Sequence, residues 1–325
     1  MFDSADSVFK SMNEFGKESK PFLFGIDFKV ENGFFIHPEN AAANSIFYSL
    51  NGKSNFYPKT SFESPVQLSK NPIPFEKYLE AFRHVHSNLV AGNSYLTNLT
   101  FPTALSLNLS LSEAFARCNA RYKLLFKDSF VVFSPEIFVQ ISNGVIRSFP
   151  MKGTIDAAIA GAESQILNDR KEMAEHNTIV DLIRNDLSMV AADVKVERFR
   201  YIEKIDTHDK SLLQVSSEIS GVLPIDYKDN IGTIFRKLLP AGSISGAPKQ
   251  KTLQIINEAE NYDRGFYTGV FGIFDGHSLD SGVMIRFIRK ENENYTFCSG
   301  GGITVQSNPE TEYAELIDKV YVPIV

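Results

Sequence analysis

Cysteine is nearly absent from this chain of 325 residues, which contains only Cys118 and Cys298. Two cysteines cannot build the disulfide framework that holds small secreted domains together, so the chain must rely on a hydrophobic core. Its 43% hydrophobic residues allow a sizeable one. The first 25 residues mix charges with single apolar residues, which is not the pattern of a signal peptide. We therefore expect a cytoplasmic location.

Long apolar runs and basic tracts are missing as well. No segment approaches the roughly 18 apolar residues of a membrane helix. A net charge of −6 without a basic tract argues against nucleic acid or an anionic lipid surface as the main partner. An anionic substrate would need local basic groups, backbone N–H groups or a metal ion. No repeat and no long flexible linker divides the chain, so we predict one domain over residues 1–325.

The segment F-P-M-K-G-T-I (149–155) places Lys152 at the end of a strand-like stretch, directly before a glycine. A lysine there is usually a solvated charge, and the alternative is an amine directed into a cleft as a nucleophile or anion ligand. The turn sequence Ser142-Asn143-Gly144 predicts a β-hairpin. Because that turn brings Glu136 nearly opposite Lys152, the two could share one end of the hairpin, either in a cleft or as an exposed cross-strand ion pair.

Two helical regions carry acidic residues. Apolar spacing predicts a helix over Glu163–Ala192, and most of the acids along it would normally face solvent. Asn308-Pro309 is a typical helix start, and the residues that follow put two acids and a lysine on one face. An exposed Glu315–Lys319 pair is the simpler interpretation of that face. The acids concerned are Glu172, Glu175, Asp181 and Asp186 in the first region and Glu312 and Glu315 in the second.

Two glycine-rich segments have more than one interpretation. The segment 238–249 leads into an amphipathic run, Gln250–Ala259, so its backbone N–H groups could bind an anion at a helix N-terminus. It is not a Walker A loop, because G-x-x-x-x-G-K-[ST] does not occur. Three adjacent glycines, Gly300 to Gly302, indicate a place where side chains are excluded by packing or by a ligand.

The order and wording of these motifs resemble the chorismate-utilising enzymes, and most closely the aminodeoxychorismate synthase component I group. The resemblance covers about residues 90–323 and leaves 1–75 as a shortened N-terminal part. Its motifs are G-N-S-Y-L-T-N-L-T (92–100), F-S-P-E-I-F (133–138), P-M-K-G-T (150–154), A-E-H-N-T-I-V-D-L-I-R-N-D-L (174–187), P-A-G-S-I-S-G-A-P-K (240–249), R-G-F-Y-T-G (264–269), I-R-F (285–287) and C-S-G-G-G-I-T-V-Q-S-N-P-E-T-E-Y-A-E-L-I-D-K-V (298–320).

The resemblance implies an α+β fold, a β-sandwich of two antiparallel sheets with helices packed outside and the active site between the sheets. It also implies 4-amino-4-deoxychorismate formation for 4-aminobenzoate and folate biosynthesis. In that reaction Lys152 attacks C2 of chorismate, Glu136 protonates the leaving C4 hydroxyl, and ammonia then adds at C4. The chemistry requires a depressed pKa for Lys152 and a raised one for Glu136. Neither cysteine has a glutaminase setting, so ammonia would come from a separate glutamine amidotransferase subunit.

The remaining site residues follow from the same resemblance. Glu175 and Glu315, with Glu312 close by, correspond to ligands of a magnesium ion, which favours carboxylates, waters and an anionic substrate. Lys319 flanks this site. The enolpyruvyl carboxylate would meet Ser243, Tyr267, Arg286 and the backbone N–H groups of Gly300 and Gly302, with the guanidinium offering a bidentate fork.

The chain also departs from the family pattern. Leu96 stands where ammonia-using members usually have glutamine and water-using members have lysine, and Leu213 replaces a polar histidine. No match to a tryptophan-binding segment is found before residue 90, so feedback inhibition by tryptophan is not expected. Two alternatives stay open: anthranilate synthase component I, whose members carry alanine at the position of Lys152, and a non-catalytic nucleotide- or phosphate-binding protein that uses the 242–249 loop.

Overall fold

Two large antiparallel sheets form the centre of the computed structural model, which describes residues 2–57, 65–206 and 211–323. The first sheet has the strand order β1 (Asp3–Ser4), β3 (Asn32–Ile36), β2 (Phe22–Ile26), β16 (Val270–Phe274), β17 (Leu279–Val283), β10 (Ile137–Ser142), β11 (Val145–Ser148), β14 (Ser211–Val222) and β12 (Met151–Asp156), with β13 (Ala192–Asp206) also paired to β14. The second has the order β15 (Gly246–Ala247), β7 (Leu96–Leu107), β19 (Asn294–Ile303), β18 (Phe287–Glu291), β9 (Phe130–Ser134), β8 (Tyr122–Phe126), β4 (Ile46–Leu50) and β5 (Lys53–Ser54), with β6 (Leu68–Asn71) beside β7.

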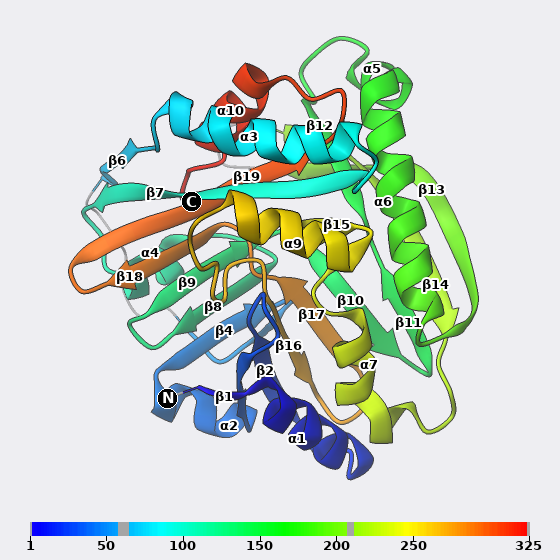
Figure 1. The fold of residues 1–325 in the computed structure, drawn as a ribbon. Helices are drawn as coiled ribbons and strands as arrows, with labels where there is room; N and C mark the ends of the chain where they lie inside the picture. The colour runs from blue at the N-terminus through cyan, green and yellow to red at the C-terminus, as the bar shows by residue number, and fades with distance from the viewer. Residues whose placement is uncertain (1, 58–64, 207–210, 324–325) are drawn as a thin grey trace.

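The helices lie on the outer sides of these sheets (Figure 1). On the second sheet, β7 and β19 contact α3 (Phe75–Val90), α9 (Lys249–Ala259) and α10 (Pro309–Asp318), and β8 and β9 contact α4 (Leu111–Arg117). On the first sheet, α6 (Arg170–Ser188) packs against β12 to β14, and α5 (Ala162–Asn168) packs against β12 and β14. At the other end of the first sheet, α1 (Ala5–Lys17) packs against β2, β3 and α7 (Ile231–Leu238). The short helices α2 (Pro38–Ala41) and α8 (Gly242–Ser245) and the 3-10 turns η1 (Ala42–Asn44) and η2 (Tyr227–Asn230) complete the described helical turns. The predicted α+β sandwich is confirmed.

Apolar side chains fill the space between the sheets. One buried cluster joins residues of the first sheet, such as Leu23 and Phe271, to residues of the second, such as Tyr122 and Phe130. A second cluster packs α1, α6 and α7 on the first sheet, and a third packs α3, α9 and α10 on the second. None of the helices in the described part of the chain has the length and apolar composition needed to cross a membrane.

The predicted hairpin is confirmed. Strands β10 and β11 pair Ser142 with Val145, and Asn143 and Gly144 take φ angles of 51° and 72°, as a two-residue turn requires. The helix start at Asn308-Pro309 is confirmed too, because the Asn308 side chain accepts a hydrogen bond from the backbone N–H of Thr311.

Three segments of the chain divide into separate elements, one of them a segment predicted as a single helix. Residues 124–133 form two strands, β8 and β9, joined by a turn with Lys127 at φ 52°. Residues 283–289 are also divided, because the chain leaves the first sheet after Val283 and enters the second at Phe287. The predicted helix 163–192 breaks at Asp169, whose carboxylate caps α6 by accepting from the N–H of Glu172. The polar run 168–172 lies at the break in this helix, where apolar spacing alone had predicted one continuous element.

The glycines of segment 238–249 pack against protein rather than leave room for a phosphate. A Cβ on Gly242 would stand 1.9 Å from Cδ2 of Leu182, and one on Gly246 would stand 1.9 Å from the carbonyl oxygen of Leu96. Strand β15 pairs with β7, and Lys249 donates to Asp186 Oδ2 at 3.1 Å. Close packing explains this loop, which counts against the phosphate-binding alternative.

Candidate active site

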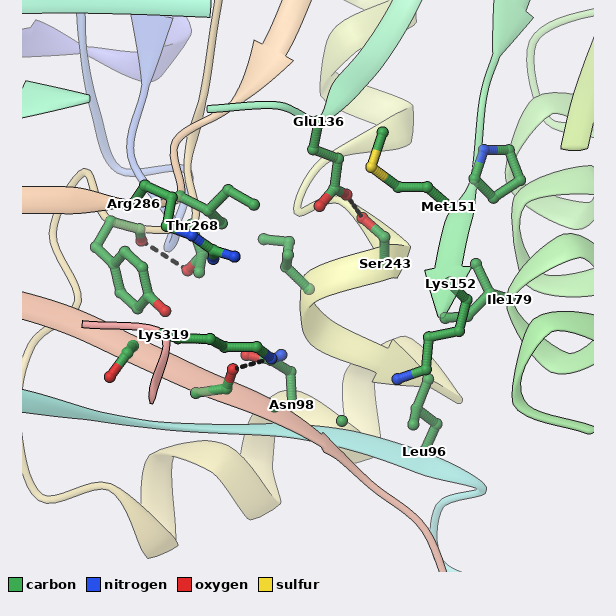
Figure 2. A pocket seen from close by; sticks show the side chains of 18 of the residues that line it. Leu96, Asn98, Glu136, Met151, Lys152, Ile179, Ser243, Thr268, Arg286 and Lys319 are labelled. Atoms are coloured by element: carbon green, nitrogen blue, oxygen red, sulfur yellow. Dashed lines mark hydrogen bonds between the residues drawn. The ribbon is translucent and has the colours of Figure 1, made fainter. Parts of the chain in front are cut away.

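A cavity of about 170 Å³ opens between the two sheets, next to α6 and α8. It is lined by all of the predicted site residues except Glu312 and Glu315. Figure 2 shows Glu136 and Ser243 on one wall, Lys152 on a second, Arg286 on a third and Lys319 near the floor. The predicted residues that line it are Glu136, Lys152, Glu175, Ser243, Tyr267, Arg286, Gly300, Gly302 and Lys319.

Lys152 reaches the cavity because its strand is irregular. The register of β12 against β14 shifts between Met151 and Thr154, and Gly153 in this bulge has φ 81°. A bulge of this kind redirects the side chain beside it. The glycine therefore allows the bulge that directs the Lys152 side chain into the cavity.

The ammonium of Lys152 contacts the carboxylate of Glu175 on α6, with Nζ 2.7 Å from Oε2. Burial alone would lower the pKa of Lys152, but Glu175, Glu315 and Glu172 outweigh burial, so this pKa is raised. The expectation of a depressed pKa is therefore not met in the arrangement that the structure shows. The carboxylates that surround the lysine are the cause.

Glu136 lies on the other side of the cavity and interacts with different partners. The Ser243 hydroxyl donates to Glu136 Oε1 at 2.7 Å. Burial raises the pKa of Glu136, and Ser243, Arg286 and Lys319 offset only part of that effect. The raised pKa agrees with what a general acid near neutral pH needs. No Glu136–Lys152 ion pair forms among the described residues, so the cross-strand pair considered from the sequence is wrong, although both side chains share the cavity.

Two cations give the cavity positive charge. Arg286 lies where the chain passes between the sheets, with φ 52°, and its Nε donates to the Tyr321 hydroxyl at 3.3 Å. Lys319 donates to the carbonyl of Gly300 at 2.9 Å and pairs with Glu315 at 2.6 Å. Burial lowers the pKa of Lys319. The charges of Arg286 and Lys152 lower it further, and the neighbouring Glu315 carboxylate raises it by less than this combined effect. Together they make this side of the cavity suitable for a carboxylate.

The acidic face of α10 meets the triple glycine. A Cβ on Gly301 would stand 3.5 Å from Glu312 Oε2, 3.7 Å from Lys319 Nζ and 3.8 Å from Glu315 Oε1. Oxygen donors of this kind suit magnesium. Across the described ranges, however, no three His, Cys, Asp or Glu side chains converge closely enough to hold a metal ion. Lys152 pairs with Glu175 and Lys319 pairs with Glu315, so each of these two carboxylates has a lysine as its cationic partner.

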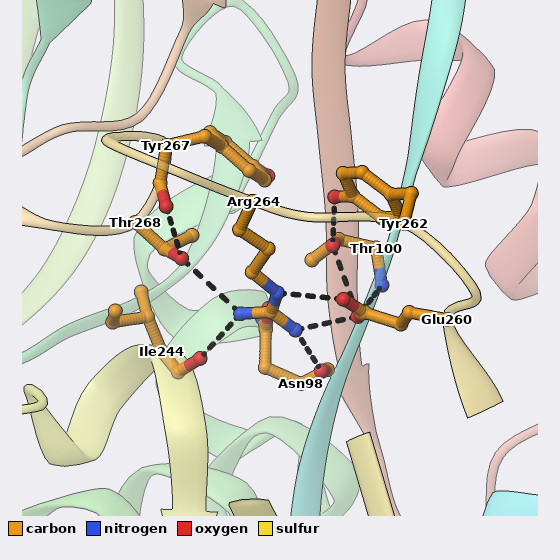
Figure 3. Close-up of polar contacts among 8 residues, drawn as sticks. All are labelled: Asn98, Thr100, Ile244, Glu260, Tyr262, Arg264, Tyr267 and Thr268. Atoms are coloured by element: carbon orange, nitrogen blue, oxygen red, sulfur yellow. Dashed lines mark hydrogen bonds and ion pairs between the residues drawn. The ribbon is translucent and has the colours of Figure 1, made fainter. Parts of the chain in front are cut away.

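A buried ion pair behind the cavity holds three of its lining segments together (Figure 3). Arg264 donates from Nε to Glu260 Oε2 at 2.7 Å and from Nη2 to Glu260 Oε1 at 2.5 Å. Its other N–H groups donate to the carbonyls of Asn98 at 2.7 Å and Ile244 at 3.2 Å and to the Thr268 hydroxyl at 3.2 Å. All five donors of the guanidinium are thus used, and β7, α8 and the segment before β16 are fixed relative to one another.

Sequence reasoning missed several residues of the cavity. Asn98, Met151, Thr268 and Ser299 line it, as does Leu96. The side-chain alternation of a strand could have indicated Asn98, because it lies two positions after Leu96 and therefore on the same face of β7. Leu213, which replaces a family histidine, pairs with Ile155 and Lys204 outside the cavity lining.

Comparison with known proteins agrees with this fold. The family model described as chorismate binding enzyme matches residues 37–324. A Haemophilus influenzae protein described as "Uncharacterized PabA-like protein" is 52% identical over 96% of this chain and 95% of its own length. Aminodeoxychorismate synthase component 1 of Salmonella typhimurium is 34% identical over 75% of this chain, which corresponds to 56% of that longer protein.

Solved structures share the fold. MenF, the menaquinone-specific isochorismate synthase of Escherichia coli, aligns with a TM-score of 0.74 over 98% of this chain and 82% of that chain, at 15% identity. The fold and the cavity define an enzyme of the chorismate-utilising class. The chain belongs to the chorismate binding enzyme family.

Proposed function

We propose that this enzyme is an aminodeoxychorismate synthase component I, which converts chorismate and ammonia to 4-amino-4-deoxychorismate and water. The observation that carries the proposal is a lysine amine, Lys152, and a carboxylic acid of raised pKa, Glu136, on different walls of one cavity. The Salmonella typhimurium relative named aminodeoxychorismate synthase component 1 supports the same reaction.

The first half of the reaction exchanges oxygen for nitrogen at the ring. The Lys152 amine forms a bond to C2 of chorismate, the two ring double bonds shift from C1=C2 and C5=C6 to C1=C6 and C4=C5, and the C4–O bond breaks. Glu136 gives its proton to the departing hydroxyl, which leaves as water, while the nitrogen now bonded to C2 stays a secondary ammonium. Ser243 holds the Glu136 carboxyl during this transfer, through the hydrogen bond of 2.7 Å.

Ammonia completes the reaction. It forms a bond to C4, both ring double bonds shift back, and the C2–N bond breaks, so that Lys152 leaves as the neutral amine. The Glu136 carboxylate takes a proton from the new C4 ammonium and is ready for the next turnover. Lys152 thus splits one difficult substitution into two easier steps.

The two carboxylates of chorismate are assigned to different groups. Arg286 and Tyr267, with Ser243 and the N–H groups of Gly300 and Gly302, hold the enolpyruvyl carboxylate. Glu175, Glu312 and Glu315, with Lys319 beside them, are the residues that would hold a magnesium ion near the ring carboxylate, and binding it would require these carboxylates to move closer together than they lie among the described residues. Bound magnesium would supply positive charge that neutralises these carboxylates, which are the groups that raise the pKa of Lys152. We assign ammonia supply to a separate glutamine amidotransferase subunit.

Product identity tests this proposal. The purified chain is incubated with chorismate, Mg²⁺ and an ammonium salt, and the products are separated and identified by mass. We expect 4-amino-4-deoxychorismate. Anthranilate with pyruvate as the product would favour the anthranilate synthase alternative, and isochorismate would show that water rather than ammonia is the nucleophile. Calorimetric binding of ATP without any response to chorismate would support the nucleotide-binding alternative.

A further inference from the structure

The carboxamide of Asn98 lines the cavity but has no role in the mechanism above. Strand alternation places Leu96 and Asn98 on one face of β7, whereas the intervening Thr97 is fully buried and Leu99 packs toward α3 and α9. Figure 2 shows Leu96 below Lys152 and Asn98 near the end of Lys319. These two residues of β7 therefore form part of the cavity floor.

The side-chain oxygen of Asn98 is buried and finds no hydrogen-bond partner among the described residues. A buried acceptor left without a donor is unfavourable, and native proteins keep few of them. The backbone of the same residue is held firmly, because its carbonyl accepts from Arg264 Nη2 at 2.7 Å (Figure 3). The strand is thus fixed, while the buried amide oxygen has no hydrogen-bond donor among the described residues.

The other polar groups of the cavity indicate which ligand this oxygen lacks. Arg286 and Lys319 are cations and suit carboxylates, whereas Glu136 and Lys152 face the reacting carbons in the proposed mechanism. Ammonia is the one reactant that carries only N–H donors and a lone pair. An amide oxygen accepts an N–H without removing the proton, whereas a carboxylate favours ammonium, which has no lone pair to attack carbon.

We propose that Asn98 Oδ1 accepts a hydrogen bond from ammonia and positions it for attack, an inference that rests on the proposed amination reaction. Leu96 offers no polar atom at the neighbouring position of the same strand face. Asn98 is therefore the amide group through which β7 binds the incoming nucleophile. This role is a positioning one, and the bond to C4 still forms from the ammonia lone pair.

The test replaces Asn98 by a residue of similar size without an acceptor, Asn98→Leu, and measures steady-state rates with ammonia and chorismate varied separately. Loss of one hydrogen bond should raise KM for ammonia by about tenfold. KM for chorismate should stay within about twofold, and so should the rate at which chorismate adds to Lys152 when ammonia is omitted, followed by intact mass. Thermal unfolding of the variant checks that it folds.

Two further variants keep the test decisive. Adding Leu96→Gln to Asn98→Leu returns an amide to the same face of β7 and should recover most of the ammonia affinity. Asn98→Asp keeps an acceptor of the same size, so it should retain ammonia KM but lower kcat, because the carboxylate holds ammonium. An unchanged ammonia KM in Asn98→Leu would overturn the inference, and so would a rise confined to chorismate KM. Absence of any aminated product from the unmodified chain would instead overturn the proposed function.

Discussion

Two buried ion pairs of this enzyme differ in how fully their hydrogen-bonding capacity is used. Arg264 and Glu260 have side chains 1% and 3% exposed, and every N–H of the guanidinium has an acceptor in the protein. The side chains of Lys152 and Glu175 are 29% and 8% exposed, and Glu175 is the one close ion-pair partner of this lysine in the described part of the chain. The first pair can only hold the fold, whereas the second can exchange partners.

The same contrast extends to the residues around each pair. Around Arg264, the Thr100 backbone N–H and hydroxyl both donate to Glu260, and Tyr262 bonds to Thr100. Around the cavity, Asn98 Oδ1, Ser299 Oγ and His176 Nδ1 are buried without hydrogen-bond partners within the described residues. The network around Arg264, in which every guanidinium N–H has an acceptor, makes that region rigid. The groups around the cavity keep unused hydrogen-bond acceptors and can therefore bind a ligand.

The largest effect is expected from removing the lysine amine. Lys152→Ala should lower the rate of amination by at least about a thousandfold, because the nucleophilic step is lost. Lys152→Arg is the matched control, since it keeps a cation beside Glu175 but offers no neutral amine. Product formation by mass is the measurement. If Lys152→Arg kept near-normal activity, the positive charge alone would be the contribution of this residue.

Replacing the proposed acid should be the next largest change. Glu136→Gln keeps a partner for Ser243 but has no proton to give, so kcat should fall by about a hundredfold to ten-thousandfold. The protonated form is the active one, so activity of the native chain should fall as pH rises through the raised pKa of Glu136. That limb of the pH profile should be absent from the variant, and its persistence would assign the limb to another group.

Breaking the Arg264–Glu260 ion pair should lower the free energy of unfolding more than it lowers the rate of the reaction. Arg264→Met leaves the buried Glu260 carboxylate without its cationic partner and should cost about 3–5 kcal/mol in the free energy of unfolding. The measurement is urea unfolding of each variant. A double variant, Arg264→Met with Glu260→Leu, should recover part of this loss, because no charge is then left unpaired. Equal losses in the single and double variants would mean that the hydrogen bonds to Asn98, Ile244 and Thr268 contribute more than the charge.

The smallest effect concerns His176, which is fully buried beside the cavity and bonds to the Ser217 hydroxyl at 2.7 Å. Burial, with help from Arg200 and Lys152, lowers its pKa from 6.5 to about 4. The neutral imidazole is favoured in the fold, so its contribution is complete above pH 6.5 and is lost as pH falls toward 4. The loss should approach about 3 kcal/mol. Unfolding at several pH values, with His176→Gln as the control, should show a smaller pH dependence for the variant.

The sequence was most informative where local chemistry decides the structure. The Asn143-Gly144 turn and the Asn308 cap follow from the preferences of a few adjacent residues, and both were predicted correctly. The motifs carrying Glu136, Lys152 and Arg286 indicated the cavity through their resemblance to a family. That step supplied the two-sheet architecture, which apolar periodicity alone did not.

Other features depend on contacts between distant segments and could not be read from periodicity. Lys152 was expected opposite Glu136 along a hairpin, yet a bulge and the edge position of β12 turn it toward Glu175 on α6. Its pKa was expected to fall, and the carboxylates gathered from α6 and α10 raise it. Asn98 was not recognised, because its distinguishing property is an acceptor that lacks a partner in the folded chain.

The most direct test of covalent catalysis by Lys152 is the intact mass of the chain after it is mixed with chorismate and Mg²⁺ without ammonia. A reactive Lys152 predicts a covalent adduct with the mass of chorismate less one water, located by peptide mapping to the peptide that contains Lys152. The adduct should be absent from Lys152→Arg and should disappear when ammonia is added, with release of 4-amino-4-deoxychorismate. Formation of that product at full rate with no adduct at any time, or an adduct on another residue, would contradict the account.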